Sequence, residues 1–151
     1  MRRFNNDLNA GTGDLTRGHE IFTRICAVCH TLFGEGGKVG PDLTHSNRDR
    51  EFLLGSIVDP SAAIRKEYLA YEVTTKDGRI LSGVISDQTG GNLTLATSTG
   101  ERVTVPQTQI VSLRESSVSL MPEDLVKPLK PQELRDLFSY LQSNKPAAAS
   151  K

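Results

Sequence analysis

The sequence has only two cysteines among its 151 residues, which excludes both a disulfide framework and a zinc site with four cysteine ligands. Charge of one sign is not in excess either, because 18 basic side chains balance 18 acidic ones. The chain therefore has no general attraction for nucleic acid or for an anionic membrane. No apolar run approaches the roughly 18 residues that span a bilayer, and the start of the chain has no signal-peptide hydrophobic stretch. We expect no nucleic-acid partner and no membrane span.

The two cysteines that are present form a C-x-x-C-H motif, made by Cys26, Cys29 and His30. Two thiols at this spacing, followed directly by a histidine, are the attachment signature of c-type haem. Each thiol adds across one haem vinyl group, and the imidazole of His30 binds the iron from one face. The motif predicts one covalently bound haem c.

Two other interpretations of the motif remain open. A C-x-x-C pair can be a thioredoxin-like redox couple, but that couple requires a preceding strand and a βαβ unit. Here an amphipathic helix pattern precedes the pair. A Cys-Cys-His zinc site is the other alternative, with His19 or His45 as its fourth ligand.

Apolar periodicity predicts three main helices, at residues 14–26, 48–58 and 131–144. The glycine-rich stretch from residue 31 to residue 47 predicts a loop without regular structure that wraps one face of the haem. The polar residues 1–13 are typical of a flexible arm, and residues 146–151 of a disordered tail. A helical frame with long connections is therefore expected.

Between residues 69 and 113 the apolar period changes from that of a helix to two, which is typical of strands. Asp77-Gly78 and Thr99-Gly100 supply turns between the alternating segments. Five short strands about ten residues apart predict a small antiparallel sheet or barrel. The apolar positions that carry this pattern are Leu69, Tyr71, Val73, Ile80 to Ile85, Leu93, Leu95, Val103, Val105 and Ile110 to Leu113.

The second axial ligand of the iron determines what a haem can do. A methionine sulfur opposite His30 would give six-coordinate iron with a raised potential, suited to electron transfer. The chain has only Met1 and Met121, and we favour Met121 because Pro122 stiffens the chain beside it. His45 is the main rival, since bis-histidine ligation would lower the potential, and His19 is a weaker one.

Other residues have possible roles around the haem. The carbonyl oxygen of Pro41 can accept the remaining ring hydrogen of His30 and so fix its tautomer. An ordinary loop proline is an equally good interpretation. Arg48, Arg50 and Tyr68 are candidates for contacts with the haem propionates, but a structural role suits each of them better.

These features together resemble a class I cytochrome c. The whole stretch of residues 14–142 is more closely similar to the haem-binding domain of planctomycetes and verrucomicrobia. The resemblance is carried by Gly18 and Phe22 before the C-x-x-C-H motif, Gly40-Pro41-Asp42-Leu43, Asp59-Pro60-Ser61, Thr75-Lys76-Asp77-Gly78, Ser119-x-Met121-Pro122 and Leu137-Phe138-Ser139-Tyr140-Leu141.

The resemblance implies that Cys26, Cys29 and His30 bind haem and that Met121 is the distal ligand. It implies a mainly α protein, with a class I cytochrome c fold and an inserted small antiparallel β-sheet or barrel. The helical domain would be discontinuous, formed by residues 14–66 and 116–145, and residues 67–115 would be the insertion. The first and last helices would cross closely, with Gly18 and Phe22 against Leu137 and Tyr140.

The sequence therefore predicts an electron carrier rather than an enzyme. Its partner would be an exported or fused dehydrogenase, or a terminal electron acceptor. Because haem is attached to thiols outside the bacterial cytoplasm, a periplasmic or otherwise extracytoplasmic location is expected. Two alternatives stay open: a haem peroxidase or gas or redox sensor with a labile distal ligand, and a partner-binding module that acts through the β insertion.

Overall fold

The computed structural model describes residues 1–144, so the tail expected at residues 146–151 lies outside the described residues. The helices are α1 (Arg2–Asn9), α2 (Leu15–Ile25), α3 (Arg50–Val58) and α4 (Pro131–Leu141), with short 3-10 turns η1 (Lys66–Tyr68) and η2 (Gln107–Gln109). The strands are β1 (Thr31–Leu32), β2 (Glu35–Gly36), β3 (Ala70–Thr75), β4 (Ile80–Thr89), β5 (Asn92–Ala96), β6 (Arg102–Pro106) and β7 (Ile110–Glu115).

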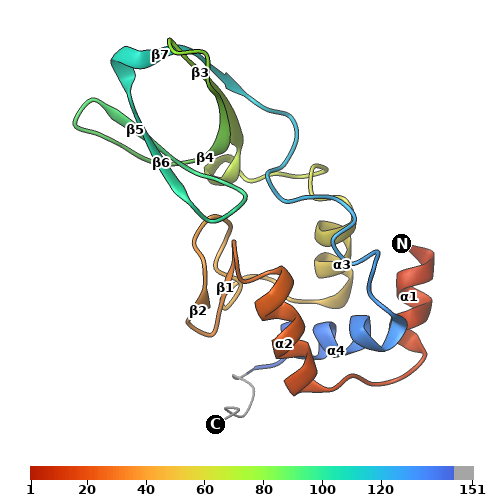
Figure 1. Ribbon diagram of the computed structural model, residues 1–151. Coiled ribbons are helices and arrows are strands. Elements are labelled where there is room, and N and C mark those ends of the chain that lie inside the picture. Colours follow the sequence, from red (N-terminus) through yellow and green to blue (C-terminus); the bar gives the residue numbers. More distant parts are fainter. Residues whose placement is uncertain (145–151) are drawn as a thin grey trace.

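Helices account for 31% of the described residues and strands for 25%, so the expectation of a mainly α protein is wrong. The reason is that β3 to β7 follow one another through short turns, and they contribute almost as many residues as the helices. The prediction of five strands in this region is confirmed, as are the three main helices, which correspond to α2, α3 and α4. Figure 1 shows the sheet at one end of the molecule and the helices at the other.

Helices α2 and α4 cross in close contact because Gly18 has no side chain. A Cβ atom at Gly18 would lie 1.9 Å from the carbonyl oxygen of Asp136 and 2.8 Å from the Cβ of Tyr140. The rings of Phe22 and Tyr140 also meet, with their centroids 5.4 Å apart. Leu137 is fully buried in the same core. The expected packing of the first predicted helix against the last is confirmed.

Helix α1 forms from residues that the sequence indicated as a flexible arm. Its only buried side chain is that of Leu8, which joins the helical core. The guanidinium of Arg135, on α4, donates a hydrogen bond of 2.7 Å to the carbonyl oxygen of Asp7. Burial of one leucine and this hydrogen bond fix an otherwise polar helix beside α4 (Figure 1).

The five long strands form an antiparallel sheet in the order β6-β5-β4-β3-β7. It has its own small core, made by Val73, Leu93 and Leu95, each nearly or completely buried. The helical core is separate and includes α3 through Leu53 and Leu54. Because the helices and the sheet each have a hydrophobic core of their own, they form separate packing units.

The connections between the sheet and the helices bring the sheet back toward the helical part of the chain. The short turn η1 leads from α3 into β3, and residues 116–130 lead from β7 to α4. In Figure 1 the turn between β5 and β6 approaches the loop beside β1 and β2. Within residues 1–144, none of the helices combines the length and the apolar character that crossing a membrane requires.

Candidate functional site

The C-x-x-C-H motif lies where helix α2 ends. Cys26 is the C-cap residue of α2, and its backbone N–H donates to the carbonyl oxygen of Phe22 at 2.8 Å. The backbone N–H of His30 donates in turn to the carbonyl oxygen of Cys26 at 2.9 Å. This tight turn gathers both cysteines and His30 at one helix terminus. Both thiols are free and partly exposed.

The environment of the thiols disfavours thiol–disulfide chemistry. Burial, together with the nearby Cys29, raises the pKa of the Cys26 thiol to about 12. Burial also raises the pKa of Cys29. Catalytic C-x-x-C couples depend on a lowered thiol pKa, and they follow a strand, whereas Cys26 follows a helix. The thioredoxin-like interpretation therefore loses its chemical basis.

The zinc interpretation lacks a ligand set. Among the residues that the structure describes, no three or more Cys, His, Asp and Glu side chains are grouped to hold a metal ion. His19, one proposed fourth ligand, is engaged elsewhere: its Nε2 lies 2.6 Å from a carboxylate oxygen of Glu35. Its ring also packs against Tyr140, with the centroids 4.9 Å apart. His45, the other candidate, is exposed.

The imidazole of His30 is oriented by a hydrogen bond to the backbone. Its Nδ1 lies 2.8 Å from the carbonyl oxygen of Pro41. A carbonyl oxygen can only accept, so Nδ1 carries the hydrogen, and the lone pair is on Nε2. Burial lowers the pKa of His30, although the hydrogen bond to Pro41 opposes this effect. A neutral imidazole with a fixed tautomer and a free Nε2 is the form that binds iron.

Glycine 40 allows the loop to lie directly against the His30 ring. A Cβ atom at Gly40 would lie 2.6 Å from Cε1 of His30 and 3.0 Å from Nδ1. The backbone N–H of Gly40 donates to the carbonyl oxygen of Cys29 at 2.7 Å, which holds the loop in this position. Any side chain at Gly40 would displace the imidazole.

The glycine pattern predicted that the loop after His30 has no regular structure. This prediction is wrong, because the loop contains a short β-hairpin. β1 and β2 pair antiparallel, with Thr31 opposite Gly36 and Leu32 opposite Glu35. The two residues between them, Phe33 and Gly34, both have positive φ, at 52° and 83°. Positive φ at both positions of a two-residue turn produces a tight hairpin. Strands of two residues are too short to show an apolar period.

Met121 is partly buried and packs against the helical core, as Cys26 also does. Its backbone N–H donates to the hydroxyl of Ser119 at 3.1 Å, and the N–H of Ser119 donates to the hydroxyl of Ser61 at 3.0 Å. These bonds fix the segment before Met121 to the chain that follows α3. Met1, in contrast, has an exposed side chain at the start of α1.

The residues considered for the propionates have protein partners. Arg48 donates from Nη1 to the carbonyl oxygens of Leu141 and Ser143, and its guanidinium lies 5.3 Å from the ring centroid of Phe33. Arg50 donates to the side chain of Asn9 at 2.6 Å. The ring of Tyr68 lies 5.2 Å from the guanidinium of Arg65. Each of these side chains therefore already contacts another part of the protein.

The sequence did not indicate which residues of the sheet contact the motif. The Sγ of Cys29 lies 4.0 Å from the carbonyl oxygen of Ser98, in the turn between β5 and β6. In the same turn, a Cβ atom at Gly100 would lie 3.4 Å from the carbonyl oxygen of Val28. The turn therefore borders the C-x-x-C-H segment.

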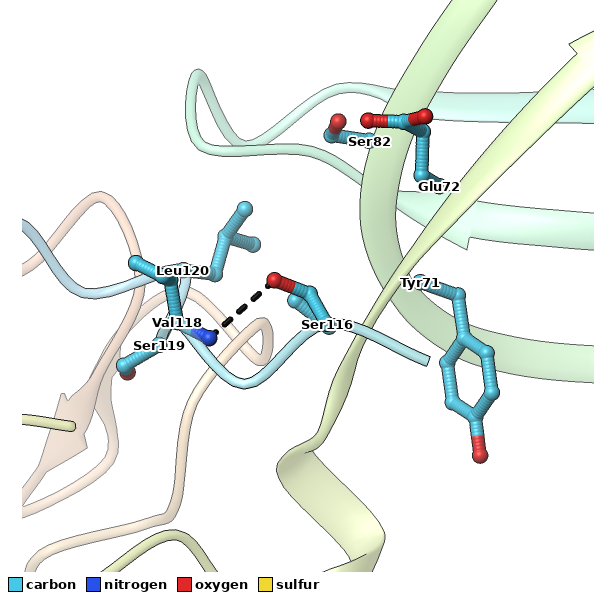
Figure 2. Close-up of a pocket in the computed structure, with 8 residues that line it drawn as sticks. Tyr71, Glu72, Ser82, Ser116, Val118, Ser119 and Leu120 are labelled. Carbon is cyan, nitrogen blue, oxygen red and sulfur yellow. Dashed lines mark hydrogen bonds between the residues drawn. The ribbon is translucent and has the colours of Figure 1, made fainter. Parts of the chain in front are cut away.

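A small cavity of about 170 Å³ lies between the sheet and the segment that leads to Met121. Figure 2 shows Tyr71, Glu72 and Ser82 on its sheet side, and Ser116, Val118, Ser119 and Leu120 on the other. The hydroxyl of Ser116 accepts a hydrogen bond of 3.1 Å from the backbone N–H of Val118. The cavity has neither a cysteine nor a histidine in its lining, and the chemistry of the C-x-x-C-H motif does not extend into it.

Residues 15–79 match the family model for cytochrome c. That family binds haem iron and transfers electrons, so the match supports haem binding and an electron carrier for this chain. The matched stretch contains Cys26, Cys29, His30 and Pro41, and it ends before Met121. Cytochrome c domains are typically extracytoplasmic.

The residues at the end of α2 fit a covalently attached haem. Two neighbouring thiols are available for thioether bonds, and the Nε2 of His30 makes no hydrogen bond to any described residue. The absence of a side chain at Gly40 leaves the imidazole in place. One histidine with its tautomer fixed by a carbonyl is a donor that binds haem iron on its proximal side.

Proposed function

We propose that this chain is a c-type cytochrome electron-transfer module that carries one haem c. Cys26 and Cys29 form the two thioether bonds, and His30 and Met121 are the axial ligands of the iron. The observation that carries the proposal is the 2.8 Å hydrogen bond from His30 Nδ1 to the Pro41 carbonyl, immediately beside the two thiols. The bound haem supplies a one-electron couple between ferric and ferrous iron.

The residues of the chain hold the haem rather than react with a substrate. The Pro41 carbonyl keeps the Nε2 of His30 aimed in one direction, and burial keeps this imidazole neutral. The bonds through Ser119 and Ser61 fix the backbone before Met121, which is consistent with a sulfur ligand held in place. A site whose ligands do not move between redox states suits rapid electron transfer.

We also propose that residues 14–66 and 116–145 form the discontinuous cytochrome domain and that residues 67–115 are an insertion. Two separate hydrophobic cores support this division, one in the helices and one in the sheet. A redox partner such as an exported or fused dehydrogenase, or a terminal acceptor, would complete the electron path. Haem attachment to thiols implies an extracytoplasmic location for the mature protein.

The test is to produce the chain in a host with the haem-attachment machinery. The proposal expects a coloured protein that keeps its haem through acid–acetone extraction and has a low-spin spectrum in both oxidation states. Replacing both cysteines, Cys26→Ser with Cys29→Ser, should make the haem extractable. Colourless wild-type protein from this host would contradict the proposal.

The distal ligand is tested by comparing Met121→Ala with His45→Ala. Loss of the sulfur ligand should give a high-spin ferric spectrum and a shifted potential in Met121→Ala only. His45 is an exposed histidine, so its replacement is the matched control and also tests the rival ligand. An unchanged low-spin spectrum and potential in Met121→Ala would refute the assignment of Met121.

A further inference from the structure

The turn between β5 and β6 lies on the backbone of the C-x-x-C-H segment. A Cβ atom at Gly100 would lie 3.4 Å from the carbonyl oxygen of Val28 and 3.5 Å from Cγ1 of the same residue. The carbonyl oxygen of Ser98 lies 4.0 Å from the Sγ of Cys29. Two residues of the turn therefore meet two successive residues of the motif, although 69 positions separate Cys29 from Ser98.

The turn itself is held by internal hydrogen bonds. The backbone N–H of Gly100 donates to the carbonyl oxygen of Thr97 at 3.0 Å, and the N–H of Thr97 donates to that of Glu101 at 2.9 Å. The hydroxyl of Thr97 lies 3.0 Å from the hydroxyl of Thr99. Gly100 has a φ of +85°, a conformation that glycine adopts without strain. The turn is a defined structure, and its position follows from the sheet.

The motif is held just as firmly on its own side. The backbone N–H of Gly37 donates to the carbonyl oxygen of Ala27 at 2.7 Å. A Cβ atom at Gly37 would lie 2.2 Å from the carbonyl oxygen of Val28, so the loop presses directly on this peptide. Val28 is 44% exposed with the β5–β6 turn in place, so the turn covers only one side of this residue. Two rigid backbones therefore meet at Val28 and Cys29.

We propose that the β5–β6 turn is a built-in cover over the Cys29 corner of the haem, which limits the access of water and small reagents there. This inference rests on the proposed function, because only a thioether at Cys29 places the porphyrin beside the turn. In that thioether the sulfur is two bonds from the ring, so a group in contact with Sγ borders the ring edge. Solvent exposure is one of the quantities that set a haem potential, so the sheet contributes to the redox properties.

The decisive comparison is Gly100→Asn against Gly78→Asn. Both glycines have nearly the same φ, +85° and +86°, and asparagine tolerates this conformation better than most residues. A side chain at Gly100 meets Val28, whereas a side chain at Gly78 meets nothing within 4 Å. The two variants therefore have equal backbone strain. At position 100 the Cβ atom is already at contact distance from Val28, so the amide group beyond it has to be accommodated between the turn and the motif.

In the haem-loaded protein, Gly100→Asn should increase the rate of reduction by ascorbate several-fold. It should also lower the midpoint potential, because water at the haem edge stabilises the more highly charged ferric state. Gly78→Asn should leave both quantities at their wild-type values. Equal reduction rates in wild type and Gly100→Asn would overturn the cover, and so would equal changes in the two variants.

A readout that is independent of electron transfer is the nuclear Overhauser effect between the Gly100 α-protons and the Val28 methyl groups in the ferrous wild-type protein. The inference requires this signal, and its absence would overturn the inference even if Gly100→Asn did not fold. Failure of the proposed function and failure of the cover give different experimental results. Protein without covalent haem contradicts the proposed function, whereas a covalent low-spin haem without this contact contradicts only the cover.

Discussion

The Nδ1 atom of His30 and the carbonyl oxygen of Pro41 are 2.8 Å apart, and Gly40 makes this approach possible. Proline 41 acts through its backbone, so its own side chain is not the sensitive position. The sensitive position is Gly40, because a Cβ atom there would lie 2.6 Å from Cε1 of the imidazole. The orientation of the proximal ligand therefore depends on a residue that has no functional group.

Gly40→Ala should reduce the yield of covalently bound haem and weaken the low-spin spectrum of the protein that forms. The physical reason is that the methyl group and the His30 ring cannot occupy their positions together, so the imidazole must turn away from Pro41. The measurement is the haem-to-protein ratio after acid–acetone extraction, with the ferric spectrum. Gly55→Ala is the control, because a Cβ atom at Gly55, on α3, would meet nothing within 4 Å. A haem yield in Gly40→Ala equal to that of the control would contradict the prediction.

Gly18→Ala should destabilise the protein through the α2–α4 crossing. The methyl group would lie 1.9 Å from the carbonyl oxygen of Asp136, so the helices must separate, at a cost of roughly 1–3 kcal/mol in the free energy of unfolding. Gly55→Ala should instead raise this free energy by up to about 1 kcal/mol, since alanine favours the helix and nothing crowds it. Urea unfolding of both variants measures the difference. A Gly18→Ala protein as stable as Gly55→Ala would show that the crossing tolerates a methyl group.

Much of this arrangement could be predicted from local patterns. The C-x-x-C-H motif, the helices and the alternating Val73, Leu93 and Leu95 each follow from residues close together in the sequence. The hydrogen bond from His30 to Pro41 could also be anticipated, because few residues separate the two and a glycine adjoins the proline. Interactions between residues that are close together in the sequence can therefore be predicted without a structure.

Other features could not be predicted, because they depend on contacts between distant segments. The approach of Ser98 to Cys29 follows from how the sheet docks on the helical part, and no residue type in the turn indicates it. Helix α1 could not be predicted because its sequence is polar. It is held in place by burial of Leu8 and by the hydrogen bond that Arg135, on α4, donates to the carbonyl oxygen of Asp7. The fold class was wrong for a different reason: the resemblance to a class I cytochrome c implied a mainly α protein, although the alternating pattern had already indicated five strands.

Arg48→Met should lower the free energy of unfolding by about 1–3 kcal/mol, because it removes the hydrogen bonds from Arg48 to the carbonyl oxygens of Leu141, the last residue of α4, and of Ser143. Methionine keeps much of the apolar contact with Phe33, so the loss reports on the hydrogen bonds. Arg50→Met is the matched control: it removes an exposed bond to Asn9 and should change stability by no more than about 0.5 kcal/mol. Thermal and urea unfolding of both variants provide the measurement. Equal losses would show that charge, rather than the cap on α4, is responsible.

Asp77→Asn should reduce the loss of stability in acid. The hydroxyl of Thr75 donates to the carboxylate of Asp77, and this bond, with the nearby Arg79, holds the pKa of Asp77 below its usual value. The folded protein therefore binds fewer protons than the unfolded chain as the pH approaches 3.8 from above. The stabilisation is complete above that value and is lost as the pH falls through the lower pKa of the folded state. Wild type should lose stability more steeply than Asp77→Asn between about pH 5 and pH 2, measured by urea unfolding at each pH.

Glu123→Gln removes the same charge from the surface but leaves the bond between Thr75 and Asp77 intact, so this variant should keep the steep acid loss of wild type. The two variants separate the hydrogen bond from the general effect of removing one carboxylate. Thr75 is 2% exposed, and its hydroxyl has the Asp77 carboxylate as its acceptor at the turn between β3 and β4. If both variants had the same pH dependence, the acid sensitivity would come from net charge, and the turn would contribute nothing specific to it.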